Sequence, residues 1–85
     1  MERSNPDLLK AFATVLRRRR REAGLSQEEF AFRCDLSTSY ISLLETQNRQ
    51  PTLTALHTIS TQLETSASEL LAEVEQLLHS RKSRS

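Results

Sequence analysis

The sequence predicts an all-α domain built from five short helices, and its composition and its apolar periodicity both support this fold class. The 85 residues include one glycine, two prolines and few runs of β-branched residues, which favours helices over a sheet. Apolar residues recur at helical spacing in segments that begin at capping residues. We therefore predict helices over residues 6–23, 27–34, 38–46, 53–64 and 67–79 of one compact domain, residues 1–79, followed by a disordered basic tail, residues 80–85.

The first predicted helix has clear signals at both ends. Asn5 can cap it, Pro6 suits its first turn because the missing N–H costs nothing there, and Gly24 favours a stop. One stripe of the helix is apolar, and it consists of Leu8, Leu9, Phe12, Val15 and Leu16. This stripe should pack against the rest of the domain.

Five consecutive arginines, residues 17–21, fill the last turns of that helix. Three of them project to its polar side, where we interpret at least two as a solvated face: Arg17, Arg18 and Arg21. Arg19 falls on the apolar stripe, so its stem should cover the core while its charged head reaches outward. Arg20 lies at the edge of the stripe, and Glu45 is its expected partner in an ion pair.

Residues 25–46 have the pattern of two short helices joined by a tight turn. Ser26 and Glu29 have the spacing of a capping box at the start of the first of these helices. Ser37 is placed to cap the second one, which carries Ile41 and Leu44 toward the core. The segment is therefore predicted to be a helix-turn-helix.

The outward face of the second of these helices is rich in small hydroxyls. A helical wheel places four residues on this face and Thr38 at its edge; the four are Ser39, Ser42, Leu43 and Thr46. Such a face offers no base, metal ligand or activated nucleophile. In a major groove, hydroxyls can bind base edges and a leucine can contact a thymine methyl. A solvated helix with one exposed leucine would show the same pattern.

The last two helices are predicted from caps and spacing. Thr52 caps the fourth, which has Leu53, Leu56, Ile59 and Leu63 at helical spacing. Ser66 and Glu69 form a second capping-box pattern. The fifth helix then has one broad apolar side, made of Ala67, Leu70, Leu71, Val74, Leu77 and Leu78. Part of this side should close the core, and the excess predicts a surface for a partner.

Several classes of function find no support in the composition. Cys34 is the only cysteine and the two histidines are distant from it, so neither an intrachain disulfide nor a zinc site is expected, and Cys34 is interpreted as a small buried residue. We find no phosphate-binding glycine loop or nucleophile constellation, so the protein is not expected to be an enzyme or to need a cofactor. Without a membrane-length apolar run or a signal peptide, a cytoplasmic location is expected.

The formal net charge of +1 is unevenly distributed along the chain. Residues 1–34 carry eight basic and five acidic side chains. Residues 52–79 carry four glutamates and neither lysine nor arginine. One end of the domain is therefore expected to be basic and the other acidic.

Four segments, GLSQEEFA, LSTSYISLLE, NRQPTLTAL and LETSASELL, together resemble the XRE-type helix-turn-helix family of phage repressors and Cro-like bacterial regulators. The resemblance covers residues 9–71, and the segment TSYISLLE is most similar to the controller proteins of restriction-modification systems. It implies a compact domain like that of the lambda repressor. A bacterial transcriptional regulator is the function that this family implies.

The resemblance also implies roles for individual residues. The base-reading positions are Thr38, Ser39, Ser42 and Leu43, and the positions that contact the DNA backbone are Gln27, Tyr40, Asn48 and Arg49. Arg20 and Glu45 match a buried ion pair, in agreement with the helical wheel. The fifth helix matches a homodimerisation surface, to which we assign Leu70, Val74, Leu77 and Leu78.

Three positions depart from the family pattern. Thr38 stands where controller proteins often carry arginine, so a bidentate guanine contact is lost and the target sequence cannot be transferred. Asp35 replaces the usual glycine and can adopt a left-handed backbone at a cost on the order of 1 kcal/mol. Arg19 replaces an aliphatic residue, which thins the core locally or marks a covered surface.

The expected function is a homodimeric regulator that binds an inverted repeat of double-stranded DNA and associates with the nucleoid when bound. The alternative is an antitoxin or adaptor that uses the same scaffold to hold a protein partner. The broad apolar fifth helix and an exposed Leu43 would support that alternative. A stable homodimer that buries the apolar side of this helix would argue against it.

Overall fold

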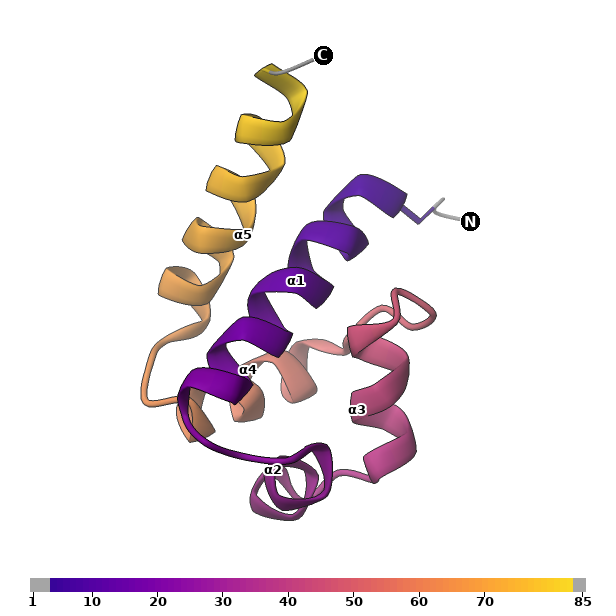
Figure 1. Ribbon diagram of the computed structural model, residues 1–85, viewed down its shortest axis with the longest axis vertical. Coiled ribbons are helices and arrows are strands. Elements are labelled where there is room, and N and C mark those ends of the chain that lie inside the picture. Colours follow the sequence, from indigo (N-terminus) through magenta and orange to yellow (C-terminus); the bar gives the residue numbers. More distant parts are fainter. Residues whose placement is uncertain (1–3, 84–85) are drawn as a thin grey trace.

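The computed structural model describes residues 4–83, which form five α-helices and, within this range, no strand (Figure 1). The helices are α1 (Pro6–Glu22), α2 (Gln27–Cys34), α3 (Thr38–Glu45), α4 (Leu53–Gln62) and α5 (Ala67–Ser83). The two long helices α1 and α5 lie side by side, and the short helices gather toward one end of this pair (Figure 1). α3 packs against both α1 and α2, so the predicted all-α fold and its helix-turn-helix are confirmed.

The predicted caps begin the helices. The side chains of Asn5, Ser26, Ser37 and Thr52 each accept a hydrogen bond from the backbone N–H three residues later, at 3.0–3.1 Å. Ser26 and Glu29 complete the capping box, because the Glu29 carboxylate accepts from the Ser26 N–H at 3.0 Å. These bonds satisfy N–H groups that the first turn of a helix leaves without partners.

Two turns use a left-handed backbone. Gly24, with φ of 74°, follows the C-cap of α1, and Asp35, with φ of 56°, ends α2. The Leu36 N–H then donates to the Ala31 carbonyl at 2.9 Å, which satisfies a carbonyl at the end of α2. Asp35 therefore makes the turn for which the family usually has glycine.

The predicted boundary of the C-terminal tail is wrong. α5 continues through Ser80 to Ser83, whereas we predicted a helix that ends at residue 79 and a disordered tail over 80–85. This segment contains neither glycine nor proline, and cationic residues suit the end of a helix, so nothing stops α5 locally. The part of the predicted tail at 84–85 lies outside the described residues. α1, α3 and α4 end one or two residues earlier than predicted.

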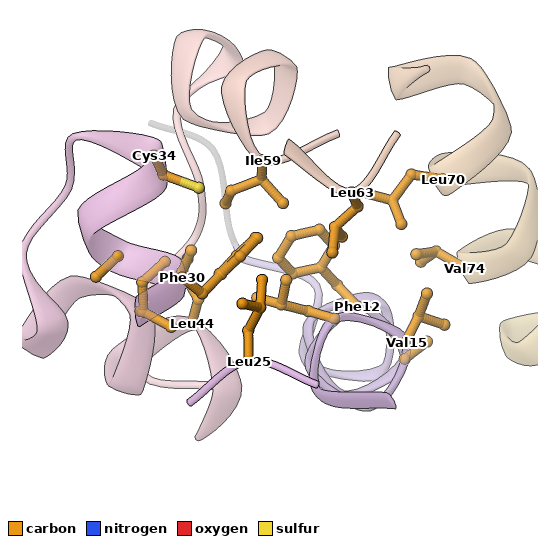
Figure 2. Close-up of a cluster of buried hydrophobic side chains, with 14 residues drawn as sticks. Phe12, Val15, Leu25, Phe30, Cys34, Leu44, Ile59, Leu63, Leu70 and Val74 are labelled. Atoms are coloured by element: carbon orange, nitrogen blue, oxygen red, sulfur yellow. The ribbon is translucent and has the colours of Figure 1, made fainter. Parts of the chain in front are cut away.

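The core lies where the five helices meet. Figure 2 shows Phe12 of α1, Phe30 of α2 and Ile59 of α4 pointing toward one another. Buried residues from every helix make up this cluster: Ala11, Phe12, Val15, Leu16, Leu25, Phe30, Ala31, Cys34, Ile41, Leu44, Ile59, Leu63, Leu70 and Val74. Because Cys34 is buried among apolar neighbours, the pKa of its thiol is raised to about 11. It is the small buried residue that the sequence predicts.

Leu53 does not belong to the core stripe of α4, and this correction has a geometric reason. Its side chain is 82% exposed, and Ala55 occupies a buried position instead. At 3.6 residues per turn, Leu53 is rotated by about 120° from Ile59 around the helix, so both cannot face the core. Leu53 therefore projects into solvent from the first residue of α4.

The apolar side of α5 is divided between the core and the surface. Leu70 and Val74 have no exposed surface and pack inside the domain (Figure 2). Their assignment to a dimer interface is wrong, because side chains already enclosed by α1 and α4 cannot reach a partner. Leu77 and Leu78 are partly buried, and Leu71 is exposed. Of the leucines on the broad side, these three remain accessible to another molecule.

Candidate nucleic-acid interface

The helix-turn-helix is fastened to α1 by the predicted ion pair between Arg20 and Glu45. Arg20 Nε lies 2.6 Å from Glu45 Oε2, and Arg20 Nη2 donates to Glu45 Oε1 at 2.9 Å. A third bond runs from Arg20 Nη1 to the carbonyl of Leu25 at 2.7 Å. Both charged residues are buried. This bidentate pairing fixes the end of α3 against α1 and against the loop that leads into α2.

Glu45 also receives donors from two residues nearer the surface. Gln27 Nε2 donates to Glu45 Oε1 at 3.1 Å, and Arg17 Nε lies 3.6 Å from the same oxygen. Burial raises the pKa of Glu45, but the hydrogen bonds from Arg20 and Gln27 outweigh it and leave the pKa below its ordinary value. The carboxylate is therefore ionised at neutral pH and holds Gln27 at the first position of α2.

A second carboxylate, Glu73, ties α5 to the same arginine run. Arg18 Nη2 lies 2.5 Å from Glu73 Oε1, Arg19 binds the other carboxylate oxygen, and Arg18 also lies 3.7 Å from Glu22. The hydrogen bond from Arg19 is the main cause that lowers the pKa of Glu73. The head of Arg19 thus extends outward from the apolar stripe, as predicted, and ends on a carboxylate.

The remaining arginines form a largely solvated face, as interpreted, because Arg18 and Arg21 are exposed, but part of this face also makes ion pairs. Arg17 and Arg18 have ion-pair partners, and of these three arginines Arg21 alone has no ion pair within residues 4–83. A wheel drawn for α1 alone cannot show that α3 and α5 bring carboxylates to either side of it. The run therefore divides, with Arg17 and Arg20 on Glu45 and with Arg18 and Arg19 on Glu73.

The outer face of α3 presents the residues that we assigned to base reading. Thr38 and Ser39 are exposed, and Ser42 and Leu43 are partly exposed. Within the described part of the chain, the hydroxyls of Thr38, Ser39 and Ser42 make no hydrogen bond and remain available as donors and acceptors. Behind this face, Ile41 and Leu44 are fully enclosed, as predicted. The helix thus has one buried side and one polar side.

The residues assigned to the DNA backbone surround α3. Tyr40 is half-buried, and its hydroxyl accepts a hydrogen bond from the Thr52 N–H at 3.2 Å, which leaves the hydroxyl proton free to donate. Asn48 Nδ2 donates to the Thr46 hydroxyl at 2.9 Å. Arg49 is exposed and has no ion pair among residues 4–83. Gln27, the first residue of α2, is oriented by its hydrogen bond to Glu45.

Two contributions to this surface were not predicted from the sequence. Gln47 adopts a left-handed backbone, with φ of 67°, and turns the chain directly after α3. Arg17 reaches the end of α3, where its Nη2 donates to the main-chain carbonyl of Glu45 at 3.4 Å. The position of Arg17, three residues before Arg20, could have indicated its contact, because residues three apart share a helix face. The turn at Gln47 has no comparable sequence signal.

Other kinds of site receive no support from the described part of the chain. Residues 4–83 contain no cluster of three His, Cys, Asp or Glu side chains that could hold a metal ion. Among the same residues, no helix has both the length and the apolar character needed to cross a bilayer.

Comparisons with known proteins assign the family. A family model described as Helix-turn-helix matches residues 16–70, which contain α2, α3 and α4. The chain belongs to this helix-turn-helix family. Its members are XRE-type transcriptional regulators that bind DNA, as the sequence segments predict, and they are not enzymes. The chain is also similar to an uncharacterized HTH-type transcriptional regulator, y4dJ, of Sinorhizobium fredii. The two are 36% identical over 70 residues, which cover 82% of this chain and 91% of that protein.

Solved helix-turn-helix structures support the same assignment. The restriction-modification controller protein C.AhdI from Aeromonas hydrophila is 35% identical, with a TM-score of 0.70 over 73% of this chain and 94% of its own. The controller protein C.Esp1396I, solved as a tetramer with its natural 35 base-pair operator, is 30% identical, with a TM-score of 0.75 over 84% and 93%. The clp gene regulator ClgR from Corynebacterium glutamicum, at 23% identity and a TM-score of 0.83 over 91% and 82%, shares the fold.

Proposed function

We propose that this protein is a sequence-specific transcriptional regulator that binds double-stranded DNA as a homodimer on an inverted-repeat site. The observation that carries the proposal is the outer face of α3, where free hydroxyls lie on a helix held rigidly from behind by Glu45 and Arg20. A rigid helix with a polar outer face fits a major groove. The similar controller protein solved with its operator gives independent support.

Base reading in this proposal belongs to Thr38, Ser39, Ser42 and Leu43. The three hydroxyls bind base edges, and Leu43 contacts a thymine methyl group. None of these side chains is a long bidentate reader, so direct contacts discriminate modestly between base pairs. Sequence-dependent DNA shape supplies the rest of the specificity.

Backbone contacts in this proposal flank α3 on both sides. Gln27, at the N-terminus of α2, contacts one phosphate with help from the positive end of the helix dipole. Tyr40, Asn48 and Arg49 contact phosphates on the other side, where the hydroxyl proton of Tyr40 and the guanidinium of Arg49 are available donors. These contacts set the affinity and the salt dependence of binding.

The homodimer is proposed to form through the exposed part of α5. Leu71, Leu77 and Leu78 remain accessible on this helix after the core is closed. Leu71 also lines a largely apolar groove of about 170 Å³ together with Leu8, Leu9 and Pro51. Two-fold pairing of two copies on this side would present two α3 helices to successive major grooves about 34 Å apart.

Selection of bound DNA from a random duplex pool at near-physiological salt tests the proposal. An enriched inverted repeat, with half-sites about one helical turn apart, is the expected result. Repeating the selection with two variants separates the assigned roles. Ser42→Ala should alter the preferred bases, whereas Arg49→Ala should keep the preferred sequence and weaken binding to every duplex. A pool that stays unenriched for wild-type protein would refute the proposal.

A second candidate function is a protein-binding module such as an antitoxin or adaptor. The observation that favours it is the exposure of two large apolar side chains on helices other than α5, Phe32 at 86% and Leu53 at 82%. Sedimentation equilibrium discriminates between the two functions. A stable homodimer would favour the regulator, and a monomer that leaves α5 uncovered would favour the binding module.

A further inference from the structure

A basic hollow lies between α1 and the end of α3, outside the residues already assigned to DNA. Its volume is about 460 Å³. Its lining combines the polar side of α1 with the end of α3 and the turn that follows, and the members that matter here are Arg17, Arg18, Arg21, Glu22, Glu45 and Gln47. Neither the core nor the assigned base-reading and backbone positions account for the arginines that line it.

Three arginines and two glutamates, Glu22 and Glu45, line the hollow, so its side chains carry a net positive charge. Glu45 is already paired bidentately with Arg20 from the buried side, so Arg17 is a second cation on one carboxylate. Arg17 keeps 43% of its side-chain surface exposed, and Arg21 is exposed without an ion pair within residues 4–83. Arg20 already neutralises Glu45, so this carboxylate does not require Arg17 as a partner. Arg21 has no intramolecular ion pair within residues 4–83 that would explain its position. Both guanidinium groups are available to an anion.

The contacts of Arg17 orient it while leaving donors free. Its Nε lies 3.6 Å from Glu45 Oε1, and its Nη2 lies 3.4 Å from the Glu45 carbonyl. A guanidinium group has five N–H donors in a fixed fork, so several remain for a second partner. Held in this way, the group loses little conformational freedom when it binds a phosphate.

The hollow adjoins the proposed path of the DNA backbone. Gln47 lines it and directly precedes Asn48 and Arg49, which are the proposed phosphate contacts after α3. Successive phosphates of one strand advance about 3.4 Å along the duplex axis. A strand held at Asn48 and Arg49 therefore brings a neighbouring phosphate within the reach of a long arginine side chain.

We propose that this hollow binds a further DNA phosphate, with Arg17 and Arg21 as its ligands. The inference rests on the proposed function and adds α1 to the DNA-binding surface. It assigns the arginine run two tasks. Arg20 secures α3 from the buried side, and Arg17 and Arg21 extend the backbone contacts beyond the loop that follows α3.

The salt dependence of DNA binding tests this site. The dissociation constant of full-length protein for its selected duplex is measured by fluorescence anisotropy across a series of KCl concentrations. The variants are Arg17→Gln and Arg21→Gln, and Arg33→Gln is the matched control because Arg33 is exposed on α2 and does not line this hollow. Each test variant should reduce the slope of log K against log salt by about 0.9, and the control should leave it unchanged.

Arg21→Gln keeps the experiment decisive if Arg17→Gln perturbs folding, because Arg21 has no ion pair to lose within the described chain. Its melting temperature should match that of wild-type protein. If wild-type protein binds its duplex and both variants keep the wild-type slope of log K against log salt, the phosphate site is refuted. The regulator proposal would still stand. No salt-dependent binding by wild-type protein would overturn both proposals.

Discussion

Glu45 connects more parts of the protein than any other side chain described above. Its carboxylate accepts hydrogen bonds from Arg20 on α1 and Gln27 on α2, and Arg17 lies close to the same group. Because Glu45 is the last residue of α3, these contacts fix α3 relative to both neighbours. A change at this residue therefore affects the stability of the fold and the orientation of Gln27 together.

Replacement of Glu45 by alanine should strongly destabilise the protein. The variant Glu45→Ala leaves the buried Arg20 without its carboxylate, and an uncompensated buried charge costs about 3–5 kcal/mol. The free energy of unfolding, measured by urea denaturation, should fall by that amount. Glu75→Ala is the control, since Glu75 is exposed on α5 and should change the value by less than about 0.5 kcal/mol. An unchanged transition for Glu45→Ala would contradict the structural role of the pair.

Acid should weaken the link between Glu73 and its two arginines. The hydrogen bond from Arg19 holds the pKa of Glu73 below its usual value of 4.5. A carboxylate whose pKa is lower in the folded state stabilises the protein above its unfolded pKa, and this contribution is lost as the pH falls through the folded pKa. The difference in unfolding free energy between wild-type protein and Glu73→Gln should therefore be largest near neutral pH and shrink below pH 4.5. Urea titrations across this range measure it, and a constant difference would exclude the ionic contribution.

At the scale of the elements, the turn between α2 and α3 determines how the helix-turn-helix closes. Asp35 adopts φ of 56° and ψ of 41°, and its N–H donates to carbonyls at the end of α2. A residue of L configuration adopts this conformation at a cost, which aspartate and asparagine tolerate best after glycine. The turn is thus stable with Asp35 but sensitive to the shape of the side chain.

A β-branched residue at position 35 should disturb this turn. Asp35→Val is expected to lower the free energy of unfolding by about 1–2 kcal/mol, because branching at Cβ conflicts with a positive φ. Asp35→Gly is the matched comparison and should be neutral or stabilising by up to about 1 kcal/mol. Chemical denaturation of both variants measures the effect. Equal stability of the valine and glycine variants would show that the backbone at this position can relax.

The starts of the helices could be predicted from sequence, whereas several faces could not. Ser26, Ser37 and Thr52 bind N–H groups three residues away, so their role is visible in a local pattern. The face of Leu53 depends on how α4 is rotated against other helices, and the burial of Val74 depends on how α1 covers α5. The rotation and packing of helices against one another leave no signal in the local sequence.

The same distinction applies to the candidate site. The pairing of Arg20 with Glu45 followed from a helical wheel and from the family resemblance, and the structure contains it. The partners of Arg18 and Arg19 did not follow, because Glu73 lies more than fifty residues away in the chain. The DNA contacts of Ser42 and Arg49 are predictions. Only binding measurements with DNA test them.

For the molecule as a whole, the proposed dimer surface on α5 lies outside the core, so its disruption can be separated from unfolding. Leu71→Glu should prevent dimerisation without unfolding the domain, because Leu71 is exposed and lines the apolar groove beside α1. Loss of the second half-site contact should weaken binding to an inverted repeat by about 10²–10⁴-fold. Sedimentation equilibrium measures dimerisation, and fluorescence anisotropy measures the affinity for DNA. Leu53→Glu is the control, since Leu53 is equally apolar but lies on α4. A dimer that persists in Leu71→Glu would exclude this face of α5 as the dimer interface.

The division of the arginine run between Glu45 and Glu73 has a mechanical consequence for DNA recognition. Four consecutive residues of α1 bind α3, the proposed recognition helix, through Glu45 and α5, the proposed dimerisation helix, through Glu73, so these contacts oppose independent motion of α3 and α5. In a two-fold dimer, the separation of the two recognition helices would then be nearly constant. Operators with a different spacer would have to twist or bend to fit, at a cost of about 1–6 kcal/mol that the DNA itself bears. Stiff and flexible spacers of equal length would thus differ in affinity although the protein never touches them.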